Sequence, residues 1–267
     1  MPLLALLMFA ASATNSQSCS NIDRLSSLPE DSTIIFGEVH GSQESPQFVA
    51  EAVCMLSVNH NVLLAIELPD EEQGRVGRYL TSSASRKERL ATLLRGPIWQ
   101  SEIQDGRSSK GMIKLLDRIR ELRDEGRSIE VVTLDVPWDT SRQVNRDEHM
   151  AQRFMAALIA HPDATPIVQI GNYHARVRPK DERGASESFA ERLESAGHSV
   201  AVLRSSQSGG KVWVCRPPAP CGIYDWPSVD PQWKWRIEYD MSPKDGFHGI
   251  YYIGEMTPSQ PAREITP

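Results

Sequence analysis

Four short apolar segments in this chain each end in side chains that can do chemistry. Glu38 and His40 follow the first segment and Glu67 follows the second, while Asp135 and His174 follow the third and fourth. Carboxylates and imidazoles can activate water, exchange protons or bind a metal ion. If the four segments form neighbouring parallel strands, their endings meet at one edge of a sheet, where open α/β proteins bind their ligands.

Two of these endings have the form Gly-x-x-His, at residues 37–40 and 171–174. Together they would bring two imidazoles to one rim, as metal ligands or as an acid and a base. Glu38 and His40 lie two residues apart, so on an extended strand their side chains point to the same side. Glu44 follows shortly after and is expected to return toward this pocket. The alternative is that Glu44 only favours the start of the next helix.

Glu67 and Asp135 come directly after strongly apolar segments, where a carboxylate is poorly placed for simple solvation. We expect them to act as metal ligands, as partners that orient a histidine, or as general bases with a raised pKa. The alternative is that they accept hydrogen bonds from nearby backbone groups. In the metal-ion interpretation, the ligands are His40, His174 and Glu67.

Hydrophobic periodicity predicts the elements that hold these side chains. Parallel strands are expected at 33–38, 62–67, 129–136, 167–171 and 199–203, with later edge strands at 211–215 and 249–254, for which antiparallel pairing is considered. Helices are expected from Ser45-Pro46, from Met112 to Gly126, over 144–158 and over 186–196. Arg146 and Asp147 open the third of these helices, where they could clamp a carboxylate, although a helix start also favours Asp147 by itself.

These elements predict an α/β fold with a mostly parallel central sheet flanked by helices. The functional site is expected at the carboxyl ends of the strands. Residues 70–111 carry no strand pattern and contain the turn sequence Asp105-Gly106-Arg107, so this segment is expected to be a helical cap over the site. Residues 19–256 are predicted to form a single domain, and the Pro-rich residues 257–267 a loose tail.

Residues 1–18 are predicted to be a signal peptide and leader, because Pro2–Ala13 is apolar and ends in a small-x-small sequence. The protein is therefore expected to be exported, periplasmic or secreted. A start codon placed too early is the alternative. This apolar run is shorter than the roughly 20 residues that a membrane-spanning helix needs, so no stable span is predicted.

Four cysteines fit an oxidising compartment. The stiff spacer between Cys215 and Cys221 favours a disulfide between them, and Cys19 would then pair with Cys54. The sequence alone cannot fix the connectivity of four cysteines, and a metal site is the rival interpretation, although no Cys-x-x-Cys is present.

The composition limits the classes of function. The chain has 267 residues, of which 40% are hydrophobic and 24% charged, with a formal net charge of -6 and no basic stripe. Nucleic acid is therefore not an expected partner, whereas a small-molecule or peptide substrate is. Serine-hydrolase elbow, Walker and dinucleotide-binding glycine motifs are all missing from the sequence.

The ordered set of motifs resembles the erythromycin esterase/ChaN-like superfamily and, more distantly, TraB/Tiki proteins. The resemblance runs from Ile34 to Leu203 and rests on Gly-Glu-Val-His-Gly at 37–41 with the glutamate at 44, Ile-Glu at 66–67, Arg-Asp-Glu-His-Met-Ala at 146–151 and Gly-Asn-Tyr-His at 171–174. It implies an α/β sheet with its site at the strand ends. The shared polar cluster would map onto the following residues: Glu38, His40, Glu44, Glu67, Arg146 and His174.

Members of that superfamily have different activities: erythromycin esterases hydrolyse an ester with a His and Glu cluster, Tiki-type members are metal-dependent proteases, and ChaN-like members bind haem. The leading hypothesis is therefore a hydrolase of an ester or peptide-type bond. In it, His40 or Glu67 activates water, alone or on a divalent metal, while His174 and Arg146 stabilise the oxyanion.

The alternative is an exported haem- or metal-binding protein without turnover. In that case, Tyr173 and the aromatic segment 226–235 would form apolar walls for a flat cofactor. A third possibility is a degenerate, inactive relative, which the intact cluster of polar residues disfavours.

Overall fold

The computed structural model describes residues 18–138, 144–179, 186–229 and 233–265. Its strands are β1 (Thr33–Glu38), β2 (Asn61–Pro69), β3 (Ile129–Asp135), β4 (Ala164–Gly171), β5 (Val200–Arg216), β6 (Ala219–Ser228), β7 (Lys234–Lys244) and β8 (Phe247–Met256). They form one sheet in the order β3-β2-β4-β1-β5-β8-β7, with β6 paired to β5. The predicted signal peptide lies almost wholly outside the described residues.

The first five strands are parallel to one another, as predicted. β1 pairs with β4 and β5, and β2 pairs with β3 and β4. The register places Glu38 opposite Gly171 and Pro69 opposite Asp135. The carboxyl ends of β1 to β4 therefore meet at one edge of the sheet, where the candidate residues were expected. β8 is also parallel to β5, while β6 and β7 are antiparallel to their neighbours.

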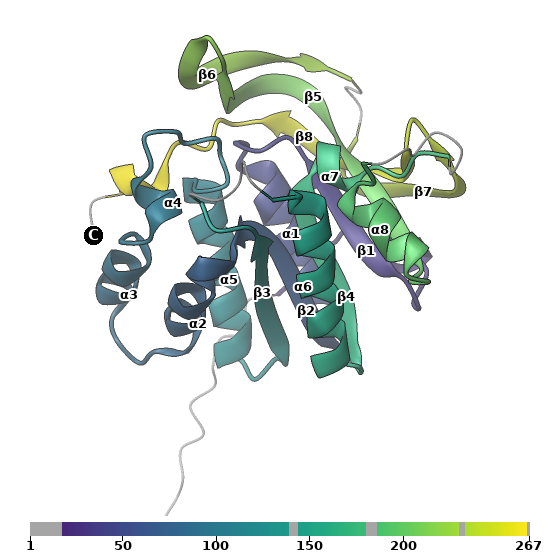
Figure 1. Ribbon diagram of the computed structural model, residues 1–267, viewed down its shortest axis with the longest axis horizontal. Coiled ribbons are helices and arrows are strands. Elements are labelled where there is room, and N and C mark those ends of the chain that lie inside the picture. The colour runs from purple at the N-terminus through teal and green to yellow at the C-terminus, as the bar shows by residue number, and fades with distance from the viewer. Residues whose placement is uncertain (1–17, 139–143, 180–185, 230–232, 266–267) are drawn as a thin grey trace, which may run out of the picture.

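Helices cover both faces of the sheet (Figure 1). They are α1 (Glu44–Leu56), α2 (Gln73–Thr81), α3 (Arg86–Leu93), α4 (Pro97–Gln100), α5 (Lys110–Asp124), α6 (Arg146–Ala160), α7 (Asn172–Ala175) and α8 (Phe189–Ser195). One face packs against α1 and α5 through residues such as Phe48 and Leu116. The other packs against α6 and α8, whose Phe154 and Phe189 rings lie 5.6 Å apart. The predicted α/β class with flanking helices is confirmed.

The strand β5 is much longer than the two short strands predicted for its residues. It continues through Gly209 and Gly210, both of which have positive φ angles. A side chain at Gly210 would lie 2.3 Å from the Met256 carbonyl oxygen, so glycine permits this close approach of β5 and β8. The far half of β5 pairs with β6 in a hairpin that rises above the carboxyl ends of the other strands (Figure 1).

Both expected disulfides are present: Cys215 is bonded to Cys221 at the end of this hairpin, and Cys19 is bonded to Cys54 on α1. Short 3-10 helices lie at Leu25–Ser27, Asp70–Glu72 and Ala262–Glu264. Within the described ranges, no helix has the length and apolar character needed to cross a bilayer.

The prediction of a loose tail is wrong for the described residues 257–265. Pro258 forms a β-bridge with Ser42, the Ser259 N–H donates to the Gly41 carbonyl, and Ser259 is fully buried. The Pro-rich composition suggested disorder, but proline leaves the flanking N–H groups free to pair, and these backbone bonds hold the segment.

The segment 70–111 is helical as far as Gln100 and holds the helices α2, α3 and α4. These helices extend the core beside the edge strand β3 and bury Trp99 completely. From Ser101 to Ser109 the chain has only turns and one β-bridge, between Ser109 and Pro261, and this stretch, called here the arginine loop, reaches the carboxyl edge of the sheet.

Candidate active site

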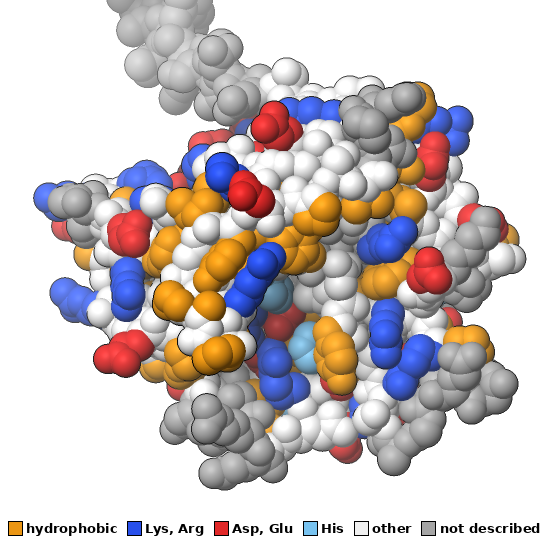
Figure 2. Space-filling model, turned by 90° about the horizontal axis from the view of Figure 1, so that it is seen from above, with side chains coloured by type: hydrophobic (Ala, Val, Ile, Leu, Met, Phe, Trp, Pro, Cys, Tyr) orange, Lys and Arg blue, Asp and Glu red, His pale blue; other side chains and the backbone are white. Residues whose placement is uncertain are grey.

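A pocket of about 370 Å³ lies at the carboxyl ends of β1, β2 and β4, next to the β5–β6 hairpin. Its lining residues are Glu38, Val39, His40, Glu67, Asp105, Arg107, Arg146, Gly171, Asn172, Tyr173, His174, Val214 and Cys215. Figure 2 looks onto this face and shows histidine and acidic side chains at the bottom of a hollow, with hydrophobic and basic side chains around it. The strand endings singled out in the sequence therefore do converge.

His40 is held between two carboxylates. Its Nδ1 lies 2.9 Å from Glu38 Oε1, and its Nε2 lies 3.2 Å from Glu67 Oε2. Burial alone would lower the pKa of His40, but the charges of these two glutamates and its hydrogen bonds to them outweigh that effect and raise the pKa to about 10. His40 is therefore an imidazolium at neutral pH.

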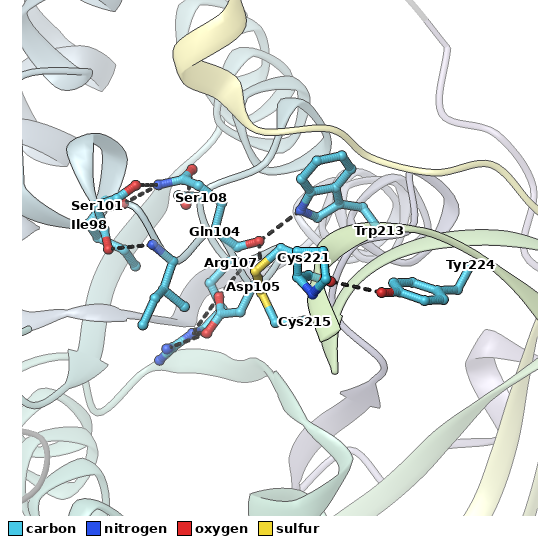
Figure 3. The surroundings of a disulfide bond; sticks show 12 residues. Ile98, Ser101, Gln104, Asp105, Arg107, Ser108, Trp213, Cys215, Cys221 and Tyr224 are labelled. Atoms are coloured by element: carbon cyan, nitrogen blue, oxygen red, sulfur yellow. Dashed lines mark hydrogen bonds and ion pairs between the residues drawn. A yellow bond between two sulfur atoms is a disulfide. The ribbon is translucent and has the colours of Figure 1, made fainter. Parts of the chain in front are cut away.

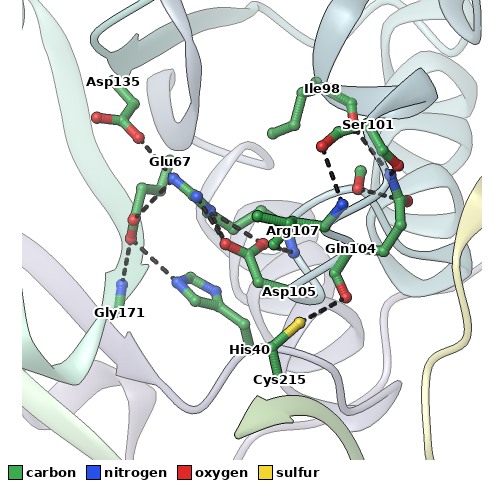
Figure 4. A network of polar contacts seen from close by, with 12 residues as sticks. His40, Glu67, Ile98, Ser101, Gln104, Asp105, Arg107, Asp135, Gly171 and Cys215 are labelled. Atoms are coloured by element: carbon green, nitrogen blue, oxygen red, sulfur yellow. Dashed lines mark hydrogen bonds and ion pairs between the residues drawn. The ribbon is translucent and has the colours of Figure 1, made fainter. Parts of the chain in front are cut away.

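Glu67 is the central carboxylate of the pocket and is almost fully buried. The Gly171 N–H donates to its Oε2 at 2.6 Å, and Arg146 donates to its Oε1 at 2.9 Å. Burial favours the neutral acid, but the charge of His40, its hydrogen bond to Glu67 and the charge of Arg107 hold the pKa of Glu67 well below its usual range. Glu67 is therefore a fixed negative charge rather than a strong base. Figure 4 shows His40, Gly171 and Arg107 around it.

His174 belongs to a second histidine–carboxylate pair. Its Nδ1 lies 2.8 Å from Asp147 Oδ1, and the same carboxylate accepts a hydrogen bond from the Phe189 N–H at 2.7 Å. The Nδ1–H tautomer that this contact favours leaves the Nε2 lone pair facing the pocket. That Nε2 lies 3.9 Å from Glu67 Oε1, which is too far for a direct hydrogen bond.

Two arginines complete the floor of the pocket. Arg146 donates from Nε to Asp135 Oδ1 at 2.9 Å and also contacts Glu67. Arg107 binds Asp135 at 2.6 Å, forms a bidentate pair with Asp105, and stacks over the Trp138 ring at 5.3 Å. Burial opposes the charge of Arg107, but the neighbouring carboxylates raise its pKa further above the ordinary value. The predicted position of Asp135 at this edge agrees with the structure.

Asp105 and Arg107 were not among the predicted site residues. The sequence Asp105-Gly106-Arg107 predicted only a turn within a cap, because nothing local distinguishes a turn arginine that enters a pocket from one that points to solvent. The turn itself was the available signal. A glycine with a positive φ lets the chain reverse direction, so the arginine that follows it can point back toward a site.

The arginine loop is fixed by the hairpin beside it. Trp213 donates from Nε1 to the Gln104 carbonyl oxygen at 2.7 Å, next to the Cys215–Cys221 disulfide (Figure 3). Gly106 lies so close to Gly41 that a Cβ on Gly106 would be 2.4 Å from the Gly41 nitrogen. The backbone that carries His40 and the backbone that carries Arg107 therefore touch each other.

Two other predicted site residues lie away from the floor. Glu44 opens α1, where its Oε2 accepts the Thr257 N–H at 2.8 Å, so the structure does not bring it to the pocket. The alternative role at a helix start describes it better. Tyr173 lies at the rim with 72% of its surface exposed. Of the predicted aromatic walls, Trp235 stacks on Phe48 in the core.

The side chains of the floor are poorly arranged for a metal ion. The expected ligands are His40, His174 and Glu67, but His40 already uses both nitrogens on carboxylates and Glu67 is paired with Arg146. Among the described residues, no group of three or more His, Cys, Asp or Glu side chains could hold a metal ion. A divalent metal stays a prediction, and no step below depends on it.

The floor suits haem no better, because haem packs in apolar surroundings with an axial ligand and this floor consists of ion pairs. Haem binding also stays a prediction.

Known structures share this fold. A mutant form of the erythromycin esterase EreC in its open conformation has a TM-score of 0.61 and 12% identity, over 86% of this chain and 92% of that chain. A succinoglycan biosynthesis protein gives a TM-score of 0.60 and 11% identity, over 86% and 89% of the two chains. A protein from Bacillus cereus gives 0.54 and 13%, over 87% and 90%. No protein-family model and no curated protein sequence matches this chain. At 11–13% identity these likenesses concern the fold, and the α/β fold that the expected resemblance implied agrees with them.

Proposed function

We propose that this protein is a hydrolase that cleaves a carboxylic ester with a water molecule activated by His174. The observation that carries the proposal is the His174–Asp147 pair, in which Nδ1 is held at 2.8 Å and Nε2 faces the pocket. A carboxylate that fixes the tautomer and orientation of a histidine is the arrangement that acyl-transfer enzymes use for a general base. The similarity of the fold to an erythromycin esterase supports this choice of reaction.

In this mechanism, His174 Nε2 takes a proton from water while the water oxygen attacks the ester carbonyl carbon. The negative charge that develops on the carbonyl oxygen is stabilised by the cationic side chains of His40 and Arg146. When the tetrahedral intermediate collapses, the bond from carbon to the alcohol oxygen breaks, and His174 returns its proton to the leaving alcohol. The protein thus needs no covalent intermediate.

This assignment of roles differs from the hypothesis made from the sequence, in which His40 or Glu67 activates the water. Both nitrogens of His40 contact carboxylates, at 2.9 and 3.2 Å, and its pKa is raised to about 10, so it is a poor base near neutral pH. The pKa of Glu67 is held low, which also weakens it as a base. We assign both residues to charge stabilisation and positioning.

The proposal is tested by ester hydrolysis at neutral pH, first with the wild-type protein after exhaustive treatment with a chelator. We expect turnover to persist. His174→Ala and Asp147→Asn should each lower kcat by about 10²- to 10⁴-fold while the circular dichroism spectrum stays that of the wild type.

Asp70→Asn is the matched control, because Asp70 forms another histidine–aspartate pair, with His149 at 3.1 Å, and neither residue lines the pocket. It should keep wild-type turnover. The mechanism would be contradicted if the chelator-treated protein were active only after a metal ion was added. It would also be contradicted if the Asp147→Asn variant were as active as Asp70→Asn. A haem band in the absorbance spectrum of the purified protein would favour the binding-protein alternative.

A further inference from the structure

The polar floor of the pocket has an apolar rim beside it. The rim consists of Val39, which directly follows β1, Tyr173 on α7, and Val214 and Cys215 on the hairpin strand β5. Val39, Val214 and Cys215 are half-buried, while Tyr173 is 72% exposed. A large exposed apolar side chain beside a pocket is available to contact a ligand, because its burial on binding is favourable.

The Tyr173 ring lies next to the proposed general base. It directly precedes His174 on the short helix α7, and the two rings are nearly perpendicular, at 88°, with their centroids 5.4 Å apart. A flat group that packs on the Tyr173 ring therefore lies beside His174. Its attached ester carbonyl can then reach the water that His174 activates, which is how contact away from the reacting atoms positions a substrate.

The charges of the floor are already paired with one another. Arg107 binds Asp105 and Asp135, Arg146 binds Glu67 and Asp135, and His40 binds both Glu38 and Glu67; His174 binds Asp147. The five carboxylates outnumber the two arginines and two histidines. A carboxylate or phosphate on the substrate would therefore have to displace an internal partner, whereas a neutral group would not.

From these observations, and resting on the proposed ester hydrolysis, we propose that the substrate is a neutral ester that carries a flat apolar group on the alcohol or acyl side. This group packs against the apolar rim, chiefly on the Tyr173 ring, while the carbonyl lies over His40 and His174. Tyr173 is then a residue that determines specificity, and it takes no part in the proton transfers.

The test compares three acetate esters that differ only in the alcohol: benzyl acetate, ethyl acetate and 4-carboxybenzyl acetate. We expect wild-type kcat/KM for the benzyl ester to exceed that for the ethyl ester by about tenfold, as contact with one aromatic ring would give. The 4-carboxybenzyl ester should lose most of this advantage. In Tyr173→Ala, kcat/KM for the benzyl ester should fall to within about twofold of that for the ethyl ester, mainly because KM for the benzyl ester rises. Tyr173→Phe should keep the wild-type preference.

The control variant is Ile159→Ala, which removes an apolar side chain that is also exposed (82%) and lies near the C-terminal end of α6, the end opposite Arg146. It should leave all three rates unchanged. Binding of 4-phenylbutan-2-one and pentan-2-one, the ketones in which CH₂ replaces the bridging ester oxygen, is measured in parallel by NMR titration. The phenyl ketone should bind about tenfold more tightly to the wild type than to Tyr173→Ala.

The two measurements separate two kinds of failure. Turnover of the esters with the benzyl preference unchanged in Tyr173→Ala would overturn the inference about the rim and leave the hydrolase intact. Absence of turnover together with Tyr173-dependent ketone binding would overturn the hydrolase and support the rim. Faster hydrolysis of the 4-carboxybenzyl ester than of the benzyl ester would overturn the preference for a neutral substrate.

Discussion

The two histidines of the site have different partners, and this difference decides what each can do. His40 contacts a carboxylate at each ring nitrogen, whereas His174 contacts one at Nδ1 and keeps its Nε2 3.9 Å from the next carboxylate. The first arrangement stabilises the imidazolium and the second leaves a lone pair for water. The same tetrapeptide form, Gly-x-x-His, therefore supports two roles in one pocket.

The raised pKa of His40 predicts how stability depends on pH. The unfolded chain loses this proton near 6.5, and the folded protein keeps it to about 10. The stabilisation is therefore fully present below pH 6.5 and is lost as the pH rises to about 10. Glu67 has the opposite sign, because its lowered pKa contributes stability above its ordinary value of 4.5 that is lost as the pH falls. We therefore expect the contribution of these two groups to the free energy of unfolding to be largest between about pH 4.5 and pH 6.5.

The measurement is urea unfolding at a series of pH values from 4 to 10. His40→Gln should flatten the alkaline decrease, while His60→Gln, which changes an exposed histidine outside the pocket, should keep the wild-type slope. An alkaline slope identical in the wild type and His40→Gln would show that His40 is not an imidazolium in the folded protein.

The site depends on the close contact between the loop after β1 and the arginine loop. This contact predicts a large effect for Gly106→Ala. The new Cβ would lie 2.4 Å from the Gly41 nitrogen and 2.7 Å from its Cα, so the backbone must move. Displacing either loop moves Arg107 or His40, and we expect turnover to fall by about 100-fold.

Gly126→Ala is the matched control, since Gly126 also has a positive φ, of 92°, but has nothing within 4 Å of the added Cβ. It should lose only about 1 to 2 kcal/mol of stability from the left-handed backbone and none of the turnover. Gly106→Ala should lose more stability than this in urea unfolding. Equal losses in the two variants, with unchanged turnover, would mean that the contact between the loops does not position the site.

How much of the site could be predicted depended on the element that carries each residue. Glu67, Asp135 and His174 could be placed because each lies at or just beyond the carboxyl end of a strand, and parallel strands bring these ends together. Arg107 could not, because its position follows from the path of an irregular loop and from a contact with Gly41 that is distant in the sequence. Glu44 was misplaced for a related reason, since a backbone N–H of the tail binds its carboxylate.

The two disulfides constrain different parts of the chain. The Cys19–Cys54 bond ties the N-terminal segment to α1 in the core, and the Cys215–Cys221 bond closes the tip of the hairpin beside the pocket. The Cys19–Cys54 bond therefore contributes to the stability of the fold. The second also belongs to the site, because Cys215 lines the pocket and Trp213 on the same strand holds the arginine loop.

We therefore expect removal of the Cys19–Cys54 bond to cost more stability and removal of the Cys215–Cys221 bond to cost more activity. A disulfide restricts the unfolded chain more when it closes a longer loop; the sequence separations of 35 and 6 residues correspond to about 4 and about 2 kcal/mol of stabilisation. Replacing Cys19 and Cys54 together by Ala should thus lower the free energy of unfolding by the larger amount and leave kcat/KM unchanged. Replacing Cys215 and Cys221 together should cost less stability but lower kcat/KM, because the rim and the loop that it supports lose their constraint. Urea unfolding and ester hydrolysis of the two double variants check both orders, and an activity loss confined to the first variant would contradict the functional role of the hairpin disulfide.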